Sequence, residues 1–173
     1  MPSIYDLALP YAKSPEYAAK MLHSIPHAPV MDRVNFILSK ASGKSVLNLG
    51  STSGGLHSLL KEVAKSVMGV DRLQPCDFEA DLDQSPAVIL DLISNNFDLI
   101  VIGELLEHLA NPGNLLAAVR PFHCPVLITA PNAHCESGFK QAASGVENVN
   151  VDHVAYYSYR TLKTLLQRYE FTI

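Results

Sequence analysis

The chain has 173 residues, enough for one hydrophobic core of ordinary size and too few for a second domain of similar size. Its net charge of −4 excludes a general nucleic-acid surface, which needs clustered lysine and arginine. No apolar run is long enough to span a membrane, and the first residues lack the basic start of a secretory signal. The three cysteines form no C-x-x-C pair and are expected to be reduced thiols, so we predict a cytoplasmic protein.

Five prolines break the first 30 residues into short pieces, and three tyrosines are scattered among them. We expect this segment to be a cap over the sheet edge, or else a lid whose tyrosines close over bound ligands. The pattern becomes regular after it. Residues 31–40 have the apolar spacing of a helix, with Val34, Ile37 and Leu38 facing inward, and Gly43 marks its end.

A βαβ unit is predicted over residues 46–71. A short apolar run ends at Leu49 in a glycine-bearing turn, and the turn opens a helix. The apolar face of that helix comprises Leu56, Leu59, Leu60 and Val63. The next apolar run ends on Asp71. This is how such a unit binds a nucleoside, because backbone amides meet the ligand and the acid accepts hydrogen bonds from two ribose hydroxyls.

Strands and helices continue to alternate along the rest of the chain, which predicts a mainly parallel sheet covered on both faces. Helices are predicted after Pro86, after the turn at residues 111–113 and over residues 160–169. The apolar runs at residues 97–103 and 126–132 are predicted to be strands.

The turn after Leu49 departs from the dinucleotide-binding pattern G-x-G-x-x-G, for which this chain offers Gly50, Thr52 and Gly55. The middle glycine lets the backbone approach a pyrophosphate, and the Thr52 side chain would stand where the phosphates pass. A ligand without phosphates suffers less from this change. The turn and the strand before it resemble the first motif of the class I S-adenosylmethionine-dependent methyltransferases of types 11 and 23, roughly [VL]-L-[DE]-[IL]-G-x-G-x-G. Here Asn48 replaces the usual acid and Thr52 the middle glycine.

The resemblance continues in order along nearly the whole chain after about residue 30. It implies an α/β fold, a three-layer sandwich with a mainly parallel twisted sheet (the Rossmann-like methyltransferase fold). Residues 77–82 resemble the family's third strand and the loop that meets the adenine, and residues 153–166 resemble its penultimate helix with the lead-in. Residues 170–173 would begin the sixth strand. The chain has no residues for the seventh, so the C-terminal strand pair is expected to be incomplete.

The resemblance also implies a site for S-adenosylmethionine, with S-adenosylhomocysteine as the product. The turn would hold the amino-acid and ribose parts, while Asp71 would accept from the ribose and Arg72 would lie beside the adenine. Asp81 and Leu82 would meet the adenine edge, and Glu104 would lie near the methionine end. The residues expected to bind the cofactor are Gly50, Ser51, Thr52, Gly54, Asp71, Arg72, Asp81, Leu82 and Glu104.

The segment E-L-L-E-H at residues 104–108 follows the predicted fourth strand. If it begins a helix, Glu104, Glu107 and His108 share one face, where they either pair locally or take part in catalysis. Similar segments occur in ubiquinone-biosynthesis O-methyltransferases and in small-RNA 3′-end methyltransferases, and in the latter a further histidine completes a divalent-metal site. His153 stands in a similar place. Glu107, His108 and His153 are therefore candidate catalytic residues and, with Glu104, a candidate site for Mg²⁺, Mn²⁺ or Zn²⁺.

We expect a single methyltransferase domain over residues 1–173, with residues 1–30 as cap or lid and residues 31–173 as the S-adenosylmethionine-binding core. The expected acceptor is a small molecule.

Two alternatives remain open. One is a non-catalytic domain that kept the fold, which the changes at Asn48 and Thr52 favour. The other is a nicotinamide-dependent oxidoreductase, which needs a pyrophosphate path past Thr52 and a Tyr-x-x-x-Lys pair. Tyr159 and Lys163 have that spacing, but they lie on an amphipathic helix near the end of the chain.

Overall fold

The computed structural model describes residues 32–51, 55–147 and 149–173. Thr52 and Gly54, which are expected to contact the cofactor, lie outside the described residues, and so does the expected cap or lid over residues 1–30. Met31–Ile173 forms one compact unit.

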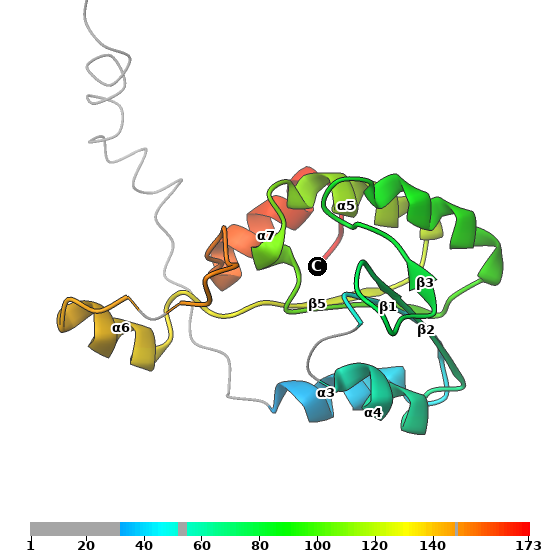
Figure 1. Cartoon of the computed structure of the whole chain (residues 1–173), viewed down its shortest axis with the longest axis horizontal. Helices are drawn as coiled ribbons and strands as arrows, with labels where there is room; N and C mark the ends of the chain where they lie inside the picture. Colours follow the sequence, from blue (N-terminus) through cyan, green and yellow to red (C-terminus); the bar gives the residue numbers. More distant parts are fainter. Residues whose placement is uncertain (1–31, 52–54, 148) are drawn as a thin grey trace, which may run out of the picture. The chain divides into compact units, whose positions relative to one another are not determined.

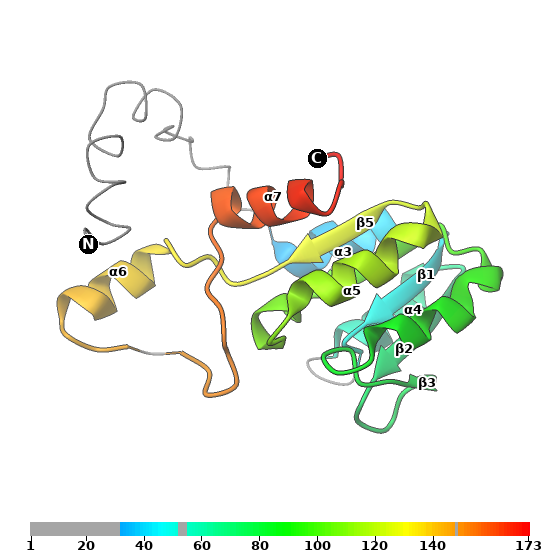
Figure 2. The same ribbon diagram turned by 90° about the horizontal axis from the view of Figure 1, so that it is seen from above.

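Five strands form one parallel sheet in the order β3-β2-β1-β4-β5 (Figure 2). They are β1 (Ser45–Leu49), β2 (Ser66–Asp71), β3 (Phe78–Glu79), β4 (Leu99–Gly103) and β5 (Val126–Thr129). The central strands β1 and β4 are buried along almost their whole length, as expected when both faces of a parallel sheet are covered. The predicted parallel sheet is confirmed.

Helices cover both faces of the sheet (Figure 1). One face carries α3 (Arg33–Ala41) and α4 (Leu56–Val63). The other carries the 3₁₀ helix η1 (Pro86–Asn95), α5 (Pro112–Val119) and α7 (Tyr159–Arg168). Shorter elements are the 3₁₀ helices η2 (Leu106–His108) and η3 (Arg120–Phe122), and the helix α6 (Glu136–Ala143). The predicted three-layer sandwich is confirmed.

Side chains of β1 point alternately into two apolar cores, because successive residues of a strand face opposite sides. Leu47 and Leu49 belong to the core under η1, α5 and α7, whereas Val46 packs with Ile37 of α3 and Leu60 of α4. The predicted apolar face of α4 is narrower than expected, since Leu59 is 37% exposed.

Polar groups determine where the helices begin and end. The Asp32 side chain accepts a hydrogen bond from the Asn35 amide at 3.1 Å, and Gly43 ends the α3 segment with a φ of 70°. Ser158 and Thr161 form a capping box at the start of α7. Both helices therefore lie within two residues of their predicted bounds.

The prediction of a sixth strand over residues 170–173 is wrong. Glu170 adopts a φ of 62°, and the amide of Phe171 donates to the Leu166 carbonyl at 3.1 Å. Phe171 thus turns back and packs against the core under α7. Among the described residues no strand lies beyond β5, and no helix is long and apolar enough to cross a membrane.

The strand order determines where a ligand can enter. The chain runs outward from β1 through β2 to β3, and then crosses to the other side of β1 to form β4 and β5. In open parallel sheets ligands bind outside the carboxyl ends of the strands where this reversal occurs. Gly50 and Glu104, which follow β1 and β4, stand at that point.

Candidate functional site

A hollow of about 100 Å³ lies at the carboxyl end of the sheet. Gly50 follows β1, Asp71 ends β2 and Arg72 follows it, and Asp81 and Leu82 follow β3. Its lining comprises Gly50, Asp71, Arg72, Ala80, Asp81, Leu82, Asp83, Leu105, His108 and Leu109. The structure therefore brings five of the expected cofactor residues around one hollow, where carboxylates, a guanidinium and leucines meet.

Local turns hold the two carboxylates in place. Asp71 Oδ1 accepts from the Leu73 amide at 3.0 Å. Asp81 Oδ1 accepts from the amides of Gln84 and Asp83, and these two bonds, with the charge of Arg72, lower the pKa of Asp81. Asp81 is consequently ionised at neutral pH.

Gly50 permits a close approach that a side chain would prevent. Its φ is 79°, and a Cβ there would lie 3.2 Å from Leu105 Cδ1. Its amide donates to the Val70 carbonyl at 2.9 Å, so Gly50 presents its Cα rather than a free N–H to the hollow.

Four lining residues were not predicted from the sequence, namely Ala80, Asp83, Leu105 and Leu109. The two leucines lie in and just after the E-L-L-E-H segment, in which only the glutamates and the histidine were predicted to be site residues. Asp83 Oδ1 accepts from the Ala110 amide at 2.9 Å and so joins the hollow to the start of α5.

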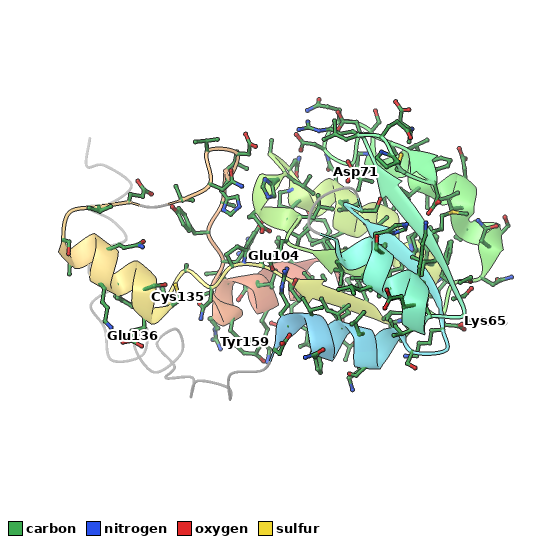
Figure 3. All side chains as sticks on the ribbon, turned by 60° about the horizontal axis from the view of Figure 1, so that its bottom comes forward. Lys65, Asp71, Glu104, Cys135, Glu136 and Tyr159 are labelled. Carbon is green, nitrogen blue, oxygen red and sulfur yellow. The ribbon has the colours of Figure 1, made fainter. Side chains whose placement is uncertain are left out.

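Glu104 does not join the other residues of the E-L-L-E-H segment. Its φ of 52° turns the chain sharply after β4, and only residues Leu106–His108 form a short 3₁₀ helix. The Glu104 carboxylate, labelled in Figure 3, instead forms an ion pair with Arg33 of α3 at 3.1 Å. The predicted shared helical face is therefore wrong. A left-handed backbone at a residue other than glycine is uncommon and is often found at functional sites.

Glu107, His108 and His153 come together, although 45 residues separate the two histidines. One potential ligand atom from each residue lies within 4.8 Å of those of the other two. The imidazole rings of His108 and His153 meet edge to face, with 4.6 Å between their centroids. His108 also lines the hollow, so the cluster borders it.

Backbone hydrogen bonds create this meeting. The amides of Val154 and Ala155 donate to the Glu107 carbonyl, at 2.8 and 3.3 Å. The Tyr157 hydroxyl donates to the Leu106 carbonyl at 3.5 Å. The segment that leads into α7 is thereby fastened along η2, which brings His153 to the cluster.

The Glu107 carboxyl is buried without a polar partner. The residue is 1% exposed, and neither carboxylate oxygen has a hydrogen-bond partner. Burial raises the pKa of Glu107, and the charge of Glu104 adds to this, whereas its own backbone, His153 and Arg33 oppose it. An acid in this state can transfer a proton, or it can bind a cation together with the two imidazoles.

Buried side-chain oxygens without a partner concentrate at this end of the sheet. Within the described part of the chain they are Ser51 Oγ, both Glu107 carboxylate oxygens and Thr129 Oγ1. Ser51 and Glu107 lie just beyond β1 and β4, and Thr129 ends β5. Buried polar groups are normally hydrogen-bonded, so each of these four oxygens has room for a hydrogen bond from a bound ligand, ion or water.

A larger cavity of about 540 Å³ lies between β5, α7 and the last residues of the chain. Val126, Leu162, Leu166 and Phe171 are among its lining residues. Among the described residues, the two linings have no member in common, and none of those expected to bind S-adenosylmethionine or a metal lines the larger cavity. Tyr159 and Lys163, which have the Tyr-x-x-x-Lys spacing, do line it.

The model of a family described as "Methyltransferase domain" matches residues 21–173. Because the match covers most of the chain, this protein belongs to that family, the S-adenosylmethionine-dependent methyltransferases. The predicted resemblance is confirmed. Among curated proteins, none is significantly similar in sequence.

Solved structures agree with the fold. The small RNA methyltransferase HEN1 is 14% identical with a TM-score of 0.61; the match covers 85% of this chain and 23% of that one. This chain thus spans less than a quarter of the HEN1 chain.

Two further structures match over more of their own length. A SAM-dependent methyltransferase from Archaeoglobus fulgidus is 17% identical, with a TM-score of 0.55 and coverage of 91% and 73%. The Burkholderia thailandensis 1,6-didemethyltoxoflavin-N1-methyltransferase, solved with 1,6-didemethyltoxoflavin and S-adenosylhomocysteine bound, is 17% identical. Its TM-score is 0.51, with coverage of 80% and 66%. At these identities the likeness concerns the fold alone.

Proposed function

We propose that this cytoplasmic methyltransferase domain transfers the methyl group of S-adenosylmethionine to a small-molecule acceptor at the carboxyl end of its sheet. The observation that carries the proposal is the hollow at the carboxyl end of the sheet, which five expected cofactor residues line. Within the described part of the chain, four buried oxygens without a partner belong to residues at the same end of the sheet. The net charge of −4 and the acidic lining favour a small acceptor over a polyanion. The similar fold of an enzyme solved with 1,6-didemethyltoxoflavin supports the same choice.

The five expected cofactor residues of the hollow have proposed roles that follow from their chemistry. When bound, S-adenosylmethionine supplies a methyl group on a positively charged sulfur. Asp71 would accept from two ribose hydroxyls, and Gly50 would let the backbone approach the nucleoside. Asp81 and Arg72 would bind the polar edge of the adenine, with Leu82 against its ring. Alignment of donor and acceptor accounts for much of the barrier reduction in such a reaction.

The donor's methionine end would meet Glu104 and the loop after β1. Glu104 offers a carboxylate to the ammonium group, next to the guanidinium of Arg33. The methionine end of the donor would supply a hydrogen-bond partner for the buried Ser51 Oγ. Thr52 and Gly54 remain proposed contacts on the basis of the motif.

The test of the proposed function is calorimetric titration with S-adenosylhomocysteine, S-adenosylmethionine and NADH. We expect the wild type to bind the first two and not NADH. Asp71→Asn keeps the Oδ1 acceptor for the Leu73 amide but loses the charge that strengthens its bonds to ribose. This variant should therefore bind S-adenosylhomocysteine at least about tenfold more weakly than the wild type, with little change in melting temperature.

The matched control is Asp91→Asn, at an exposed position on η1, which should bind like the wild type. Binding of NADH alone would support the oxidoreductase alternative. Binding of none of the three compounds would support a domain without a cofactor.

We propose further that Glu107, His108 and His153 hold a divalent cation beside the acceptor. A carboxylate with two imidazoles suits Mn²⁺ or Zn²⁺ better than Mg²⁺, which prefers oxygen ligands. The buried Glu107 oxygens, which lack partners, fit this role. When bound, the cation would lower the pKa of an acceptor hydroxyl and orient it.

Metal binding can be measured without knowing the acceptor. Calorimetric titration with Mn²⁺ should show one site in the wild type and none in Glu107→Gln or His153→Ala. Both variants should still bind S-adenosylhomocysteine within about threefold of the wild type, because neither residue lines the hollow. The control His134→Ala removes an exposed imidazole beyond β5 and should leave Mn²⁺ binding unchanged. Equal Mn²⁺ binding by Glu107→Gln and the wild type would contradict the metal site.

A further inference from the structure

His57 lies in the first turn of α4, directly after the loop that follows β1. Its imidazole joins two other parts of the molecule. Nδ1 is 3.4 Å from Asn48 Nδ2 on β1, and Nε2 is 3.3 Å from Asp77 Oδ2 in the loop before β3. The His57 side chain is only 16% exposed. Three segments, namely α4, β1 and the loop before β3, therefore converge on one ring.

The contacts select one tautomer of the imidazole. In the assigned orientation, Asn48 presents its amide N–H to Nδ1, so Nδ1 accepts. Nε2 then carries the proton and donates to the Asp77 carboxylate. Burial and the charge of Lys61 lower the pKa of His57, and Asp77 opposes them. The ring is consequently neutral at pH 7, which agrees with this pattern of one donor and one acceptor.

Gly69 makes room for this arrangement. It is the partner of Asn48 in the pairing of β1 with β2, and its amide donates to Asp77 Oδ2 at 2.7 Å. A Cβ at Gly69 would lie 2.6 Å from His57 Cε1 and 2.7 Å from Ser51 Oγ. The imidazole and the Ser51 side chain therefore both lie against the bare backbone of β2.

The ring thus lies next to groups of the proposed cofactor site. Ser51 is 6% exposed and its Oγ has no hydrogen-bond partner, while Asp71 lies two residues beyond Gly69 on the same strand. The His57 ring lies against β2 at Gly69, so a change of this side chain alters how the first turn of α4 packs on the strand that ends at Asp71.

We propose that His57 is a positioning residue for the cofactor site. Held between Asn48 and Asp77, its imidazole sets the distance from the first turn of α4 to the ends of β1 and β2. This gives a reason for the amide at position 48, since an aspartate there would accept a hydrogen bond and would favour the doubly protonated imidazolium. The inference rests on the proposed function, because the groups positioned are those proposed to bind S-adenosylmethionine.

The test compares variants of His57 by titration with S-adenosylhomocysteine. His57→Phe keeps a ring of similar size but loses both hydrogen bonds, and it should weaken binding about tenfold. His57→Gln can still donate to Asp77 through its terminal amide and should recover most of that loss. His134→Phe makes the same chemical change at an exposed histidine and should bind like the wild type.

A double-variant cycle distinguishes positioning from general destabilisation. Asn48→Leu leaves Nδ1 without its partner and should weaken binding about threefold to tenfold. The double variant Asn48→Leu/His57→Phe should bind no more weakly than His57→Phe alone, because the residues act as one unit. Nitrogen NMR should show a single His57 tautomer in the wild type, with the proton on Nε2 facing Asp77.

Two results would overturn the inference and are distinguishable. If the wild type does not bind S-adenosylhomocysteine, the proposed function fails and the positioning role fails with it. If the wild type binds and His57→Phe binds equally well while its melting temperature falls, His57 only stabilises the fold. Should His57→Phe fail to fold, Asn48→Leu decides: unchanged affinity for S-adenosylhomocysteine in that variant contradicts the positioning role.

Discussion

The Glu107 carboxyl group is almost entirely buried, and among the described residues it has no hydrogen-bond partner. An isolated charge in such a place costs several kcal/mol, so the group either keeps a proton or receives a cation. One nitrogen atom from each of two imidazoles, those of His108 and His153, lies within 4.8 Å of a carboxylate oxygen of Glu107. The burial that destabilises the ionised acid is therefore also what would make a metal ion stabilise the protein.

The stability of the protein should respond to pH through Glu107. Because burial raises the pKa of the folded protein's Glu107 above its ordinary value of 4.5, the folded state holds this proton more tightly than the unfolded chain. The resulting stability is fully present below pH 4.5 and is lost as the pH rises through the folded pKa. Glu107→Gln cannot lose the proton. We expect its free energy of unfolding, relative to the wild type, to increase across that window in urea titrations.

Added Mn²⁺ provides the check on that prediction. It should raise the stability of the wild type at pH 7 and leave Glu107→Gln unaffected, since only the wild type has the carboxylate ligand. Parallel pH profiles for the two proteins would contradict a raised pKa at Glu107.

Gly113 and Tyr169 couple α5 to the end of α7. A Cβ at Gly113 would overlap the Tyr169 hydroxyl and the adjoining ring carbon. The two helices share a core through residues such as Leu115 and Leu165, so α7 cannot simply move away. A glycine inside a helix, which usually weakens it, is here required by the packing of the next one.

Gly113→Ala should therefore destabilise the protein by about 1–3 kcal/mol, although alanine is the better helix former by about 1 kcal/mol. Chemical denaturation measures this change. Adding Tyr169→Phe removes the overlapping hydroxyl and should restore part of the loss. A Gly113→Ala variant as stable as the wild type would show that the Tyr169 side chain rotates away without cost.

Helices and strands were predicted well where their signals are local. The glycine after α3 and the apolar spacing of α7 each depend on residues that are close together in the chain, so the sequence displays them directly. The errors have another origin. Phe171 packs against the core under α7, and that contact depends on residues far along the chain.

The location of the site is a property of the whole sheet. The reversal of strand order between β1 and β4 brings loops from both halves of Met31–Ile173 to one end. β5 is an edge strand of the sheet in the described residues, and all its residues are half-buried, whereas β4 is buried almost throughout. The 540 Å³ cavity lies along β5, where the covering of the sheet is incomplete.

The sequence by itself determined the order of the elements, the family and the residues that follow strands β1, β2 and β3. These depend on short-range patterns: an apolar run, a glycine turn and an acid such as Asp71 at a fixed spacing. Parallel strands all end at the same edge, and so Gly50, Asp71 and Asp81 could be assigned to one place before their coordinates were known.

Only the tertiary structure decided which polar side chains meet. Glu104 and Glu107 are three residues apart, yet a left-handed turn sends the first to Arg33 and buries the second. His57 reaches Asn48 and Asp77 because Gly69 has no side chain. His153 reaches Glu107 through backbone bonds to a segment 46 residues away in sequence. A left-handed backbone, the absent side chain of a glycine and long-range hydrogen bonds produce no periodic pattern in the sequence. These contacts could therefore be found only from the tertiary structure.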